Sequence, residues 1–108
     1  MKTGSQLIAE ERERQISQEG WTTKHDDEHD DQALALAAAV YALPPEWRLV
    51  PSGSTTIMRR LWPFDDYWLK EGDRVRDLTK AGALIAAEID RVQRKSENDQ
   101  ALRARSDS

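Results

Sequence analysis

Three stretches of the chain are predicted to be helical and indicate an all-α fold, and apolar residues recur at helical spacing most clearly in the last of them. In the last stretch the intervals alternate between three and four residues along a seam formed by Val75, Leu78, Gly82, Ile85, Ile89 and Val92. Such intervals keep side chains on one face of an α-helix. The pattern therefore predicts a helix over about 73–95, and Gly82 within the seam suits the close approach of another helix.

A second row of side chains lies beside this seam on the same predicted helix. It places two carboxylates and an apolar pair on a neighbouring strip, made of Asp77, Ala81, Leu84 and Glu88. From Ser96 onward the chain is polar. We therefore expect one helical domain over 1–95, followed by a frayed polar tail over 96–108.

Two further helices are predicted upstream. The first covers about 5–19, with Ser5 as its cap and Gly20 as its stop signal. It has few apolar residues and needs a partner to fold against. The second covers about 29–43 and ends before a pair of prolines. Because this second helix is apolar nearly all round, it belongs at the centre of the molecule or at an oligomer interface.

Together these elements predict a compact bundle of three main helices that forms oligomers. Residues 44–72 join the second helix to the third and are rich in proline and aromatic residues. A connection this long inside a small domain usually carries function or packs as an ordered lid.

Composition narrows the class of protein. A chain of 108 residues that is 38% hydrophobic and 33% charged has room for one domain with a modest core. The net charge of −4 and the lack of a basic run argue against nucleic acid as the main partner. The sequence shows no membrane-spanning run, no signal-peptide pattern and no cysteine, so a cytoplasmic protein is expected.

Seven consecutive ionisable residues, HDDEHDD at 25–31, precede the second helix and include both histidines of the chain. On a helix His25 and His29 share one face, and His with carboxylates at this spacing can hold a divalent metal ion. A zinc protease is disfavoured, because aspartate replaces the usual glutamate base and no third ligand is evident. Alternatively, the acids cap the helix and complement its dipole, which explains two or three of them.

The sign of the charge limits what this cluster can bind. Five carboxylates repel a phosphate, so a phosphate ligand there needs bridging Mg²⁺ or Mn²⁺, or arginines from elsewhere in the chain. Six arginines are candidate sources: Arg12, Arg14, Arg59, Arg60, Arg74 and Arg76. Tryptophans beside arginines can stack planar ligands, although in small proteins they more often fill the edges of the core. The predicted ligand-binding residues are Arg12, Trp21, His25, His29, Trp62 and Trp68.

Residues 8–43 carry a four-acid pattern, Glu10-x-x-Glu13 followed by Glu28-x-x-Asp31. The pattern resembles that of the all-α (MazG-like) nucleotide pyrophosphohydrolases, although the Gly20-Trp21 break and the two histidines depart from that family's helix pair. The resemblance implies Mg²⁺ or Mn²⁺ held by Glu10, Glu13, Glu28 and Asp31. It also implies hydrolysis between the α and β phosphates of a nucleotide, with the metal as Lewis acid.

Several segments together resemble a group of small helical proteins encoded by tailed phages and prophages. They are IAEERERQI (8–16), EGWT (19–22), the 25–31 cluster, YAL (41–43), WPFD (62–65) and RDLTKAGALIAAE (76–88). The resemblance implies a phage accessory protein in the bacterial cytoplasm. It is expected to act by binding, sequestering a nucleotide-like anionic ligand or a host defence protein. The alternatives are the pyrophosphohydrolase and a purely structural or regulatory interaction protein.

Overall fold

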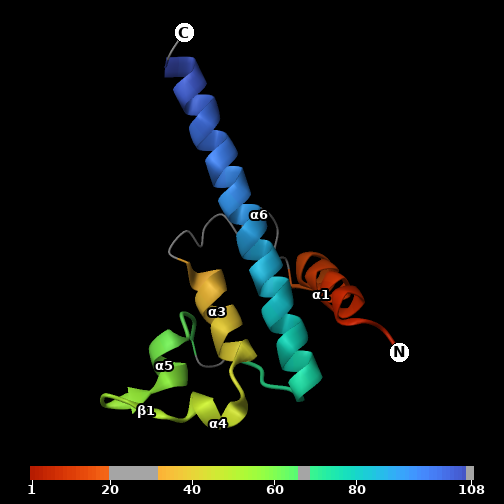
Figure 1. The fold of residues 1–108 in the computed structure, drawn as a ribbon, viewed down its shortest axis with the longest axis vertical. Helices are drawn as coiled ribbons and strands as arrows, with labels where there is room; N and C mark the ends of the chain where they lie inside the picture. The colour runs from red at the N-terminus through yellow and green to blue at the C-terminus, as the bar shows by residue number, and fades with distance from the viewer. Residues whose placement is uncertain (20–31, 66–68, 107–108) are drawn as a thin grey trace.

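The structure, a computed structural model, describes residues 1–19, 32–65 and 69–106. Within these residues the chain forms five helices and one two-stranded sheet, in the order α1 (Gly4–Gln18), α3 (Ala33–Ala42), α4 (Pro45–Arg48), β1 (Pro51–Ser52), β2 (Thr55–Thr56), α5 (Ile57–Leu61) and α6 (Arg74–Ser106) (Figure 1). The predicted helical character is confirmed. The predicted number of helices, three, is wrong: the described residues form five, because the connection after α3 folds into two short helices and a hairpin.

Helix α1 begins earlier than predicted, because Thr3 caps it instead of Ser5. The Thr3 hydroxyl accepts a hydrogen bond from the backbone N–H of Gln6 at 3.2 Å, and the Gln6 side chain accepts one from the Thr3 N–H at 2.8 Å. This reciprocal arrangement is a capping box. The helix packs against α6, and a Cβ at position 82 would overlap the Ile8 side chain. The prediction that Gly82 allows a close helix contact is therefore confirmed.

The core lies between α3 and α6. It is built from Leu34, Ala37, Ala38 and Tyr41 on α3 and from Ala81, Leu84 and Ala87 on α6. Most of these side chains are small, so the two helices approach each other closely. Within the described residues α3 starts at Ala33, while the earlier part of the predicted helix lies outside them.

Two arginines donate hydrogen bonds to the C-terminal carbonyl groups of α3 and so anchor the connection that follows this helix. Arg48 donates to the carbonyl oxygens of Val40 at 3.0 Å and Tyr41 at 3.1 Å. Arg74 donates to those of Ala42 at 2.5 Å and Leu43 at 3.0 Å. The last carbonyls of a helix have no partner within it, and here two guanidinium groups supply the donors.

Between these two arginines the chain forms a small antiparallel hairpin, in which Pro51 pairs with Thr56 and Ser52 with Thr55. Gly53 occupies its turn with a φ of +64°, a left-handed conformation that favours glycine. The hairpin leads directly into α5 and holds that helix beside α3.

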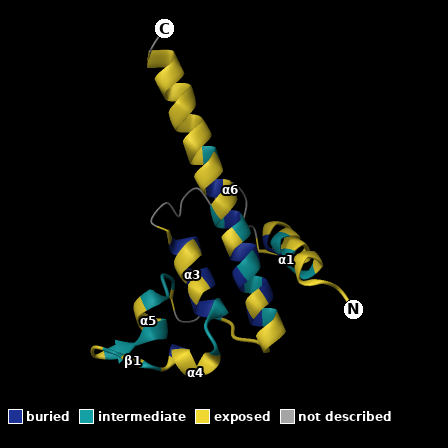
Figure 2. Ribbon diagram, in the orientation of Figure 1, coloured by how far each residue is buried: buried dark blue, intermediate teal, exposed yellow. Residues whose placement is uncertain are grey.

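Helix α6 continues to Ser106, so its predicted end near residue 95 is wrong. No glycine or proline interrupts the chain after Gly82, so the strongest helix-stop signals are absent. Its residues 95–106 are all exposed (Figure 2). The division into a domain over 1–95 and a tail over 96–108 stays a prediction.

Candidate functional site

Within the described part of the chain, the seam of α6 is a helix face whose apolar residues stay exposed. We use "the open face" for its five large residues, Val75, Leu78, Ile85, Ile89 and Val92, whose exposed fractions lie between 44 and 61%. Single exposed apolar residues are ordinary on a protein surface. Five of them at helical spacing on one face form a contiguous apolar stripe, which is typical of an interaction surface.

The open face exists because α3 packs on the neighbouring row. Asp77, Ala81 and Leu84 from that row are buried, at 1 to 3% exposure. On a helix, residues one position apart point about 100° from each other, so burying this row turns the seam away from α3. Helix α1 packs on a further side of α6 and reaches the seam at Gly82 through Ile8. Apart from Leu84, the large aliphatic residues of α6 therefore remain at the surface.

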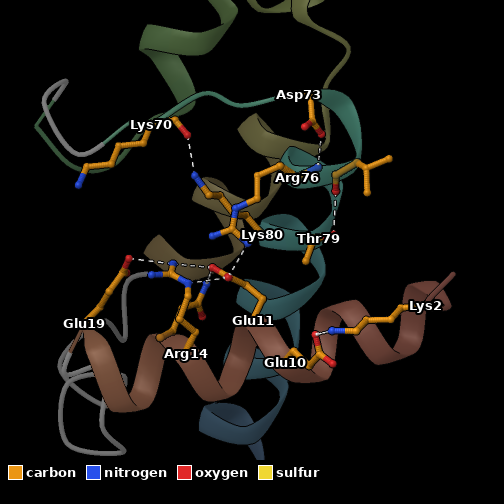
Figure 3. Close-up of polar contacts among 12 residues, drawn as sticks. Lys2, Glu10, Glu11, Arg14, Glu19, Lys70, Asp73, Arg76, Thr79 and Lys80 are labelled. Atoms are coloured by element: carbon orange, nitrogen blue, oxygen red, sulfur yellow. Dashed lines mark hydrogen bonds and ion pairs between the residues drawn. The ribbon is translucent and has the colours of Figure 1, made fainter.

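A second feature is an open groove of about 640 Å³ between α1 and the first turns of α6. Its floor holds Glu11, whose side chain is only 1% exposed. The Glu11 carboxylate accepts hydrogen bonds from Arg14 Nε and Nη2, both at 2.8 Å, and from Arg76 Nη1 at 2.7 Å (Figure 3). Gln15 donates a longer one at 3.3 Å. The carboxylate thus joins α1 to α6.

The positive and negative side chains that line this groove balance each other. Burial alone would raise the pKa of Glu11, but the hydrogen bonds from Arg14 and Arg76 outweigh it, and the pKa lies below its usual value. Arg14 also pairs with Glu19 at 2.8 Å. The charged residues that line the groove are three arginines and three carboxylates, namely Arg14, Arg74, Arg76, Glu10, Glu11 and Asp73. The groove therefore has no surplus positive charge with which to hold a phosphate.

Trp62, one of the predicted ligand-binding residues, packs at the edge of the core. Its ring meets Tyr41 edge-on at 5.6 Å between centroids and Phe64 at 5.5 Å, and its Nε1 donates to the carbonyl oxygen of Asp65. Tyr41 in turn lies beneath Lys80 Nζ, 5.3 Å from the ring centre. Burial lowers the pKa of Lys80 and raises that of Tyr41. These contacts place the Trp62 ring against the core, and its role in ligand binding stays a prediction.

The other predicted ligand-binding residues are mostly beyond what the structure describes. Arg12 lies on α1 and is half-buried. The remaining four lie outside the described residues: Trp21, His25, His29 and Trp68. Within the described residues the predicted site is thus represented only by Arg12 and Trp62, which come from different segments.

The predicted metal site is likewise described only in part. Glu10 is exposed and pairs with Lys2 at 2.8 Å, and Glu13 is exposed as well. Glu28 and Asp31 lie outside the described residues. Over 1–19, 32–65 and 69–106, no group of three or more His, Cys, Asp or Glu side chains is placed to hold a metal ion.

A buried ion pair that the sequence analysis did not predict joins the connection to α6. Arg48 and Asp77 are 2 and 1% exposed, and Arg48 Nη2 lies 2.9 Å from Asp77 Oδ2. The other Asp77 oxygen accepts a hydrogen bond from the Gly72 N–H at 2.8 Å. One signal for this pair was present: an arginine shortly after a proline-terminated helix is well placed to donate to its last carbonyls.

The chain matches no family model, no curated protein and no solved structure in the comparisons made. In the described part of the chain, no helix has both the length and the apolar character that crossing a bilayer requires. Function is therefore inferred from the described side chains.

Proposed function

We propose that the protein is a non-catalytic interaction protein that binds another protein chain through the open face of α6. The observation that carries this proposal is the exposure of Val75, Leu78, Ile85, Ile89 and Val92 on one helix face. A single helix face is convex, whereas sites for small molecules are usually concave. A partner helix, or a groove in a partner protein, has the shape that such a face fits.

The apolar surface is large enough to matter for binding. Complete burial of a valine, leucine or isoleucine side chain contributes roughly 1.5–3 kcal/mol. Each residue of the open face is about half exposed, so about 1 kcal/mol remains to be gained per residue. Five residues then supply roughly 5 kcal/mol from this side of an interface, before the cost of association.

A nucleotide-like ligand is supported less well, because the three arginines that line the groove beside α1 are matched by three carboxylates. The phage origin, the location in the bacterial cytoplasm and the role against host defences stay predictions from sequence resemblance. The pyrophosphohydrolase alternative also stays a prediction. Its test is the release of pyrophosphate from nucleoside triphosphates with Mg²⁺ or Mn²⁺, which Glu10→Ala with Glu13→Ala should abolish if the enzyme reading is right.

The proposal is tested by comparing proteins captured by the wild type with those captured by Ile85→Asp/Ile89→Asp. Leu49→Asp is the matched control, because Leu49 is a large exposed residue outside α6. Bacterial extract is passed over each immobilised protein, and bound chains, including untagged copies of the protein itself, are quantified by mass spectrometry. We expect at least one chain to be held by the wild type and the control and lost from the double variant. An identical captured set for all three proteins would refute the proposal.

A further inference from the structure

Helix α1 packs against α6 with a polar inner face. Its two buried residues are Glu11 and Gln15, whereas Ile16, one of its large apolar side chains, is 44% exposed. A surface helix is usually held by an apolar stripe that faces the core. Helix α3 follows this rule, since each of its buried residues is an alanine, leucine, valine or tyrosine. Helix α1 therefore gains less from the burial of apolar surface than α3 does.

The polar atoms that α1 buries lose little when this helix leaves α6. Arg14, which donates twice to the Glu11 carboxylate, belongs to α1 and stays with it, so release breaks only the bond from Arg76. The Arg76 side chain is 38% exposed and is already in contact with water. Gln15 Oε1 is buried without a hydrogen-bond partner in the described part of the chain. Release gives this oxygen water to accept from, which favours the released state.

Ile8 makes the apolar contact of α1 with α6, and it does so at Gly82. A Cβ at position 82 would lie 2.7 Å from Ile8 Cγ1 and nearer still to Cδ1. The Ile8 side chain thus fills the space above the Gly82 Cα, which we call the notch. Gly82 belongs to the seam, between Leu78 and Ile85. Because two side chains cannot occupy the same volume, another side chain enters the notch only if Ile8 moves out.

We propose that α1 is a releasable strap on α6, and that docking of α1 and entry of another side chain into the notch exclude each other. Segments with few buried apolar contacts open locally while the rest of the domain stays folded. Release of α1 is such an opening, and α3 stays packed on α6 through the apolar core.

One part of this inference rests on the proposed function. A partner that packs along the seam reaches the notch only in molecules whose α1 is released. Its apparent affinity is therefore reduced by the fraction of molecules in that state. The strap then acts as an autoinhibitory contact on the open face.

The first experiment measures native-state hydrogen exchange of single amides by NMR. We expect amides of residues 8–18 in α1 to be protected, but at least 100-fold less than those of residues 37–42 in α3. Glu11→Gln should lower the protection of α1 at least tenfold and leave that of α3 unchanged. Glu13→Gln is the matched control, because Glu13 is exposed on the same helix, and it should match the wild type. Equal protection of the two helices in the wild type, or a parallel fall of both in Glu11→Gln, would overturn the strap.

The second experiment fills the notch from the α6 side. Gly82→Ala places a methyl group where a side chain of a partner would enter, and alanine also favours the helical state of α6. The same exchange measurement should show α1 protection at least tenfold lower than in the wild type, with α3 unchanged. In an Ile8→Ala background, Gly82→Ala should leave α1 protection unchanged, because the notch then has room for the methyl group. Unchanged α1 protection in Gly82→Ala alone would overturn the mutual exclusion.

The strap and the proposed function fail in different ways. Hydrogen exchange needs no partner, so α1 and α3 amides that exchange together would disprove the strap and leave the proposed function standing. If α1 is released as expected but the captured proteins do not depend on Ile85 and Ile89, the proposed function is wrong and the strap stands.

Discussion

The buried pair formed by Arg48 and Asp77 gives the sharpest quantitative test of how the fold is held together. We consider Asp77→Asn, which keeps the shape of the side chain and an oxygen for the Gly72 N–H but removes the charge facing Arg48. The guanidinium is 2% exposed, so water cannot replace the lost carboxylate, and the half-exposed Glu71 carboxylate, 3.8 Å from Arg48 Nη1, replaces its charge only in part. Leaving one partner of a buried pair without its counter-charge costs about 3–5 kcal/mol.

The lower end of that range applies to Asp77→Asn, because Arg48 keeps its bonds to Val40 and Tyr41 and its pairing with Glu71 at 3.8 Å. The amide oxygen accepts from the Gly72 N–H, so the amide NH2 group faces Arg48 and the hydrogen bond from Arg48 is lost. We therefore expect the free energy of unfolding to fall by about 3 kcal/mol. For a domain of this size that corresponds to a fall in Tm of about 12 °C, or to a urea midpoint lower by about 2 M. Urea unfolding followed by circular dichroism measures the change in the free energy of unfolding. All variants are compared at one protein concentration, because association shifts the apparent stability.

The matched control is the exposed pair Lys2–Glu10, whose side chains are more than half exposed. Glu10→Gln should cost less than about 1 kcal/mol, as surface pairs generally do. In addition, Arg48→Met/Asp77→Leu should recover stability relative to Arg48→Met alone, because it removes the stranded charge. A loss below about 1 kcal/mol for Asp77→Asn, equal to that of the control, would refute the reasoning.

Two further substitutions test other contacts. Gly82→Ala should lower the free energy of unfolding by about 1–3 kcal/mol despite the better helix propensity of alanine, because the new Cβ overlaps Ile8. In an Ile8→Ala background the same Gly82→Ala substitution should be neutral or stabilising. A stabilising Gly82→Ala in the wild-type background would contradict the close contact. Glu11 has a folded-state pKa below its ordinary value of 4.5, so its contribution is present above that pH and is lost as the pH falls through the lowered pKa. Melting curves between pH 7 and pH 3 should therefore show a smaller acid-induced fall in Tm for Glu11→Gln than for the wild type, and parallel pH profiles would contradict the assignment.

The helices could be predicted from the sequence because their signals are local. Apolar spacing located α6, a cap residue and a glycine located α1, and an apolar run that ends at a proline pair located α3. The capping box of α1 was also readable, since Thr3 and Gln6 stand three apart, but Ser5 offers an equally good cap residue. The end of α6 was misplaced because polar composition was taken as a stop, although polar residues continue a helix when no glycine or proline interrupts it.

The packing partners could not be predicted in the same way, because periodicity shows which residues share a face and not what covers that face. The seam is the more hydrophobic row of α6, yet the row containing Ala81 and Leu84 is buried, since the alanines of α3 fit closely against it. The Arg48–Asp77 pair joins residues 29 positions apart, a distance over which no local pattern operates. Most of the predicted ligand site, including His25 and His29, lies outside the described residues, so that part remains a prediction.

The way α3 ends also has a consequence for synthesis of the chain on the ribosome. The carbonyls that close this helix take their donors from Arg48 and from Arg74, some thirty residues further along. A nascent chain that stops before residue 74 contains all of α3 but only half of its cap and none of the α6 surface on which it packs. A ten-residue helix is marginal by itself, so we expect α3 to form stably only after the start of α6 has left the exit tunnel. Folding would then be a late, concerted event, although synthesis proceeds from the N-terminus.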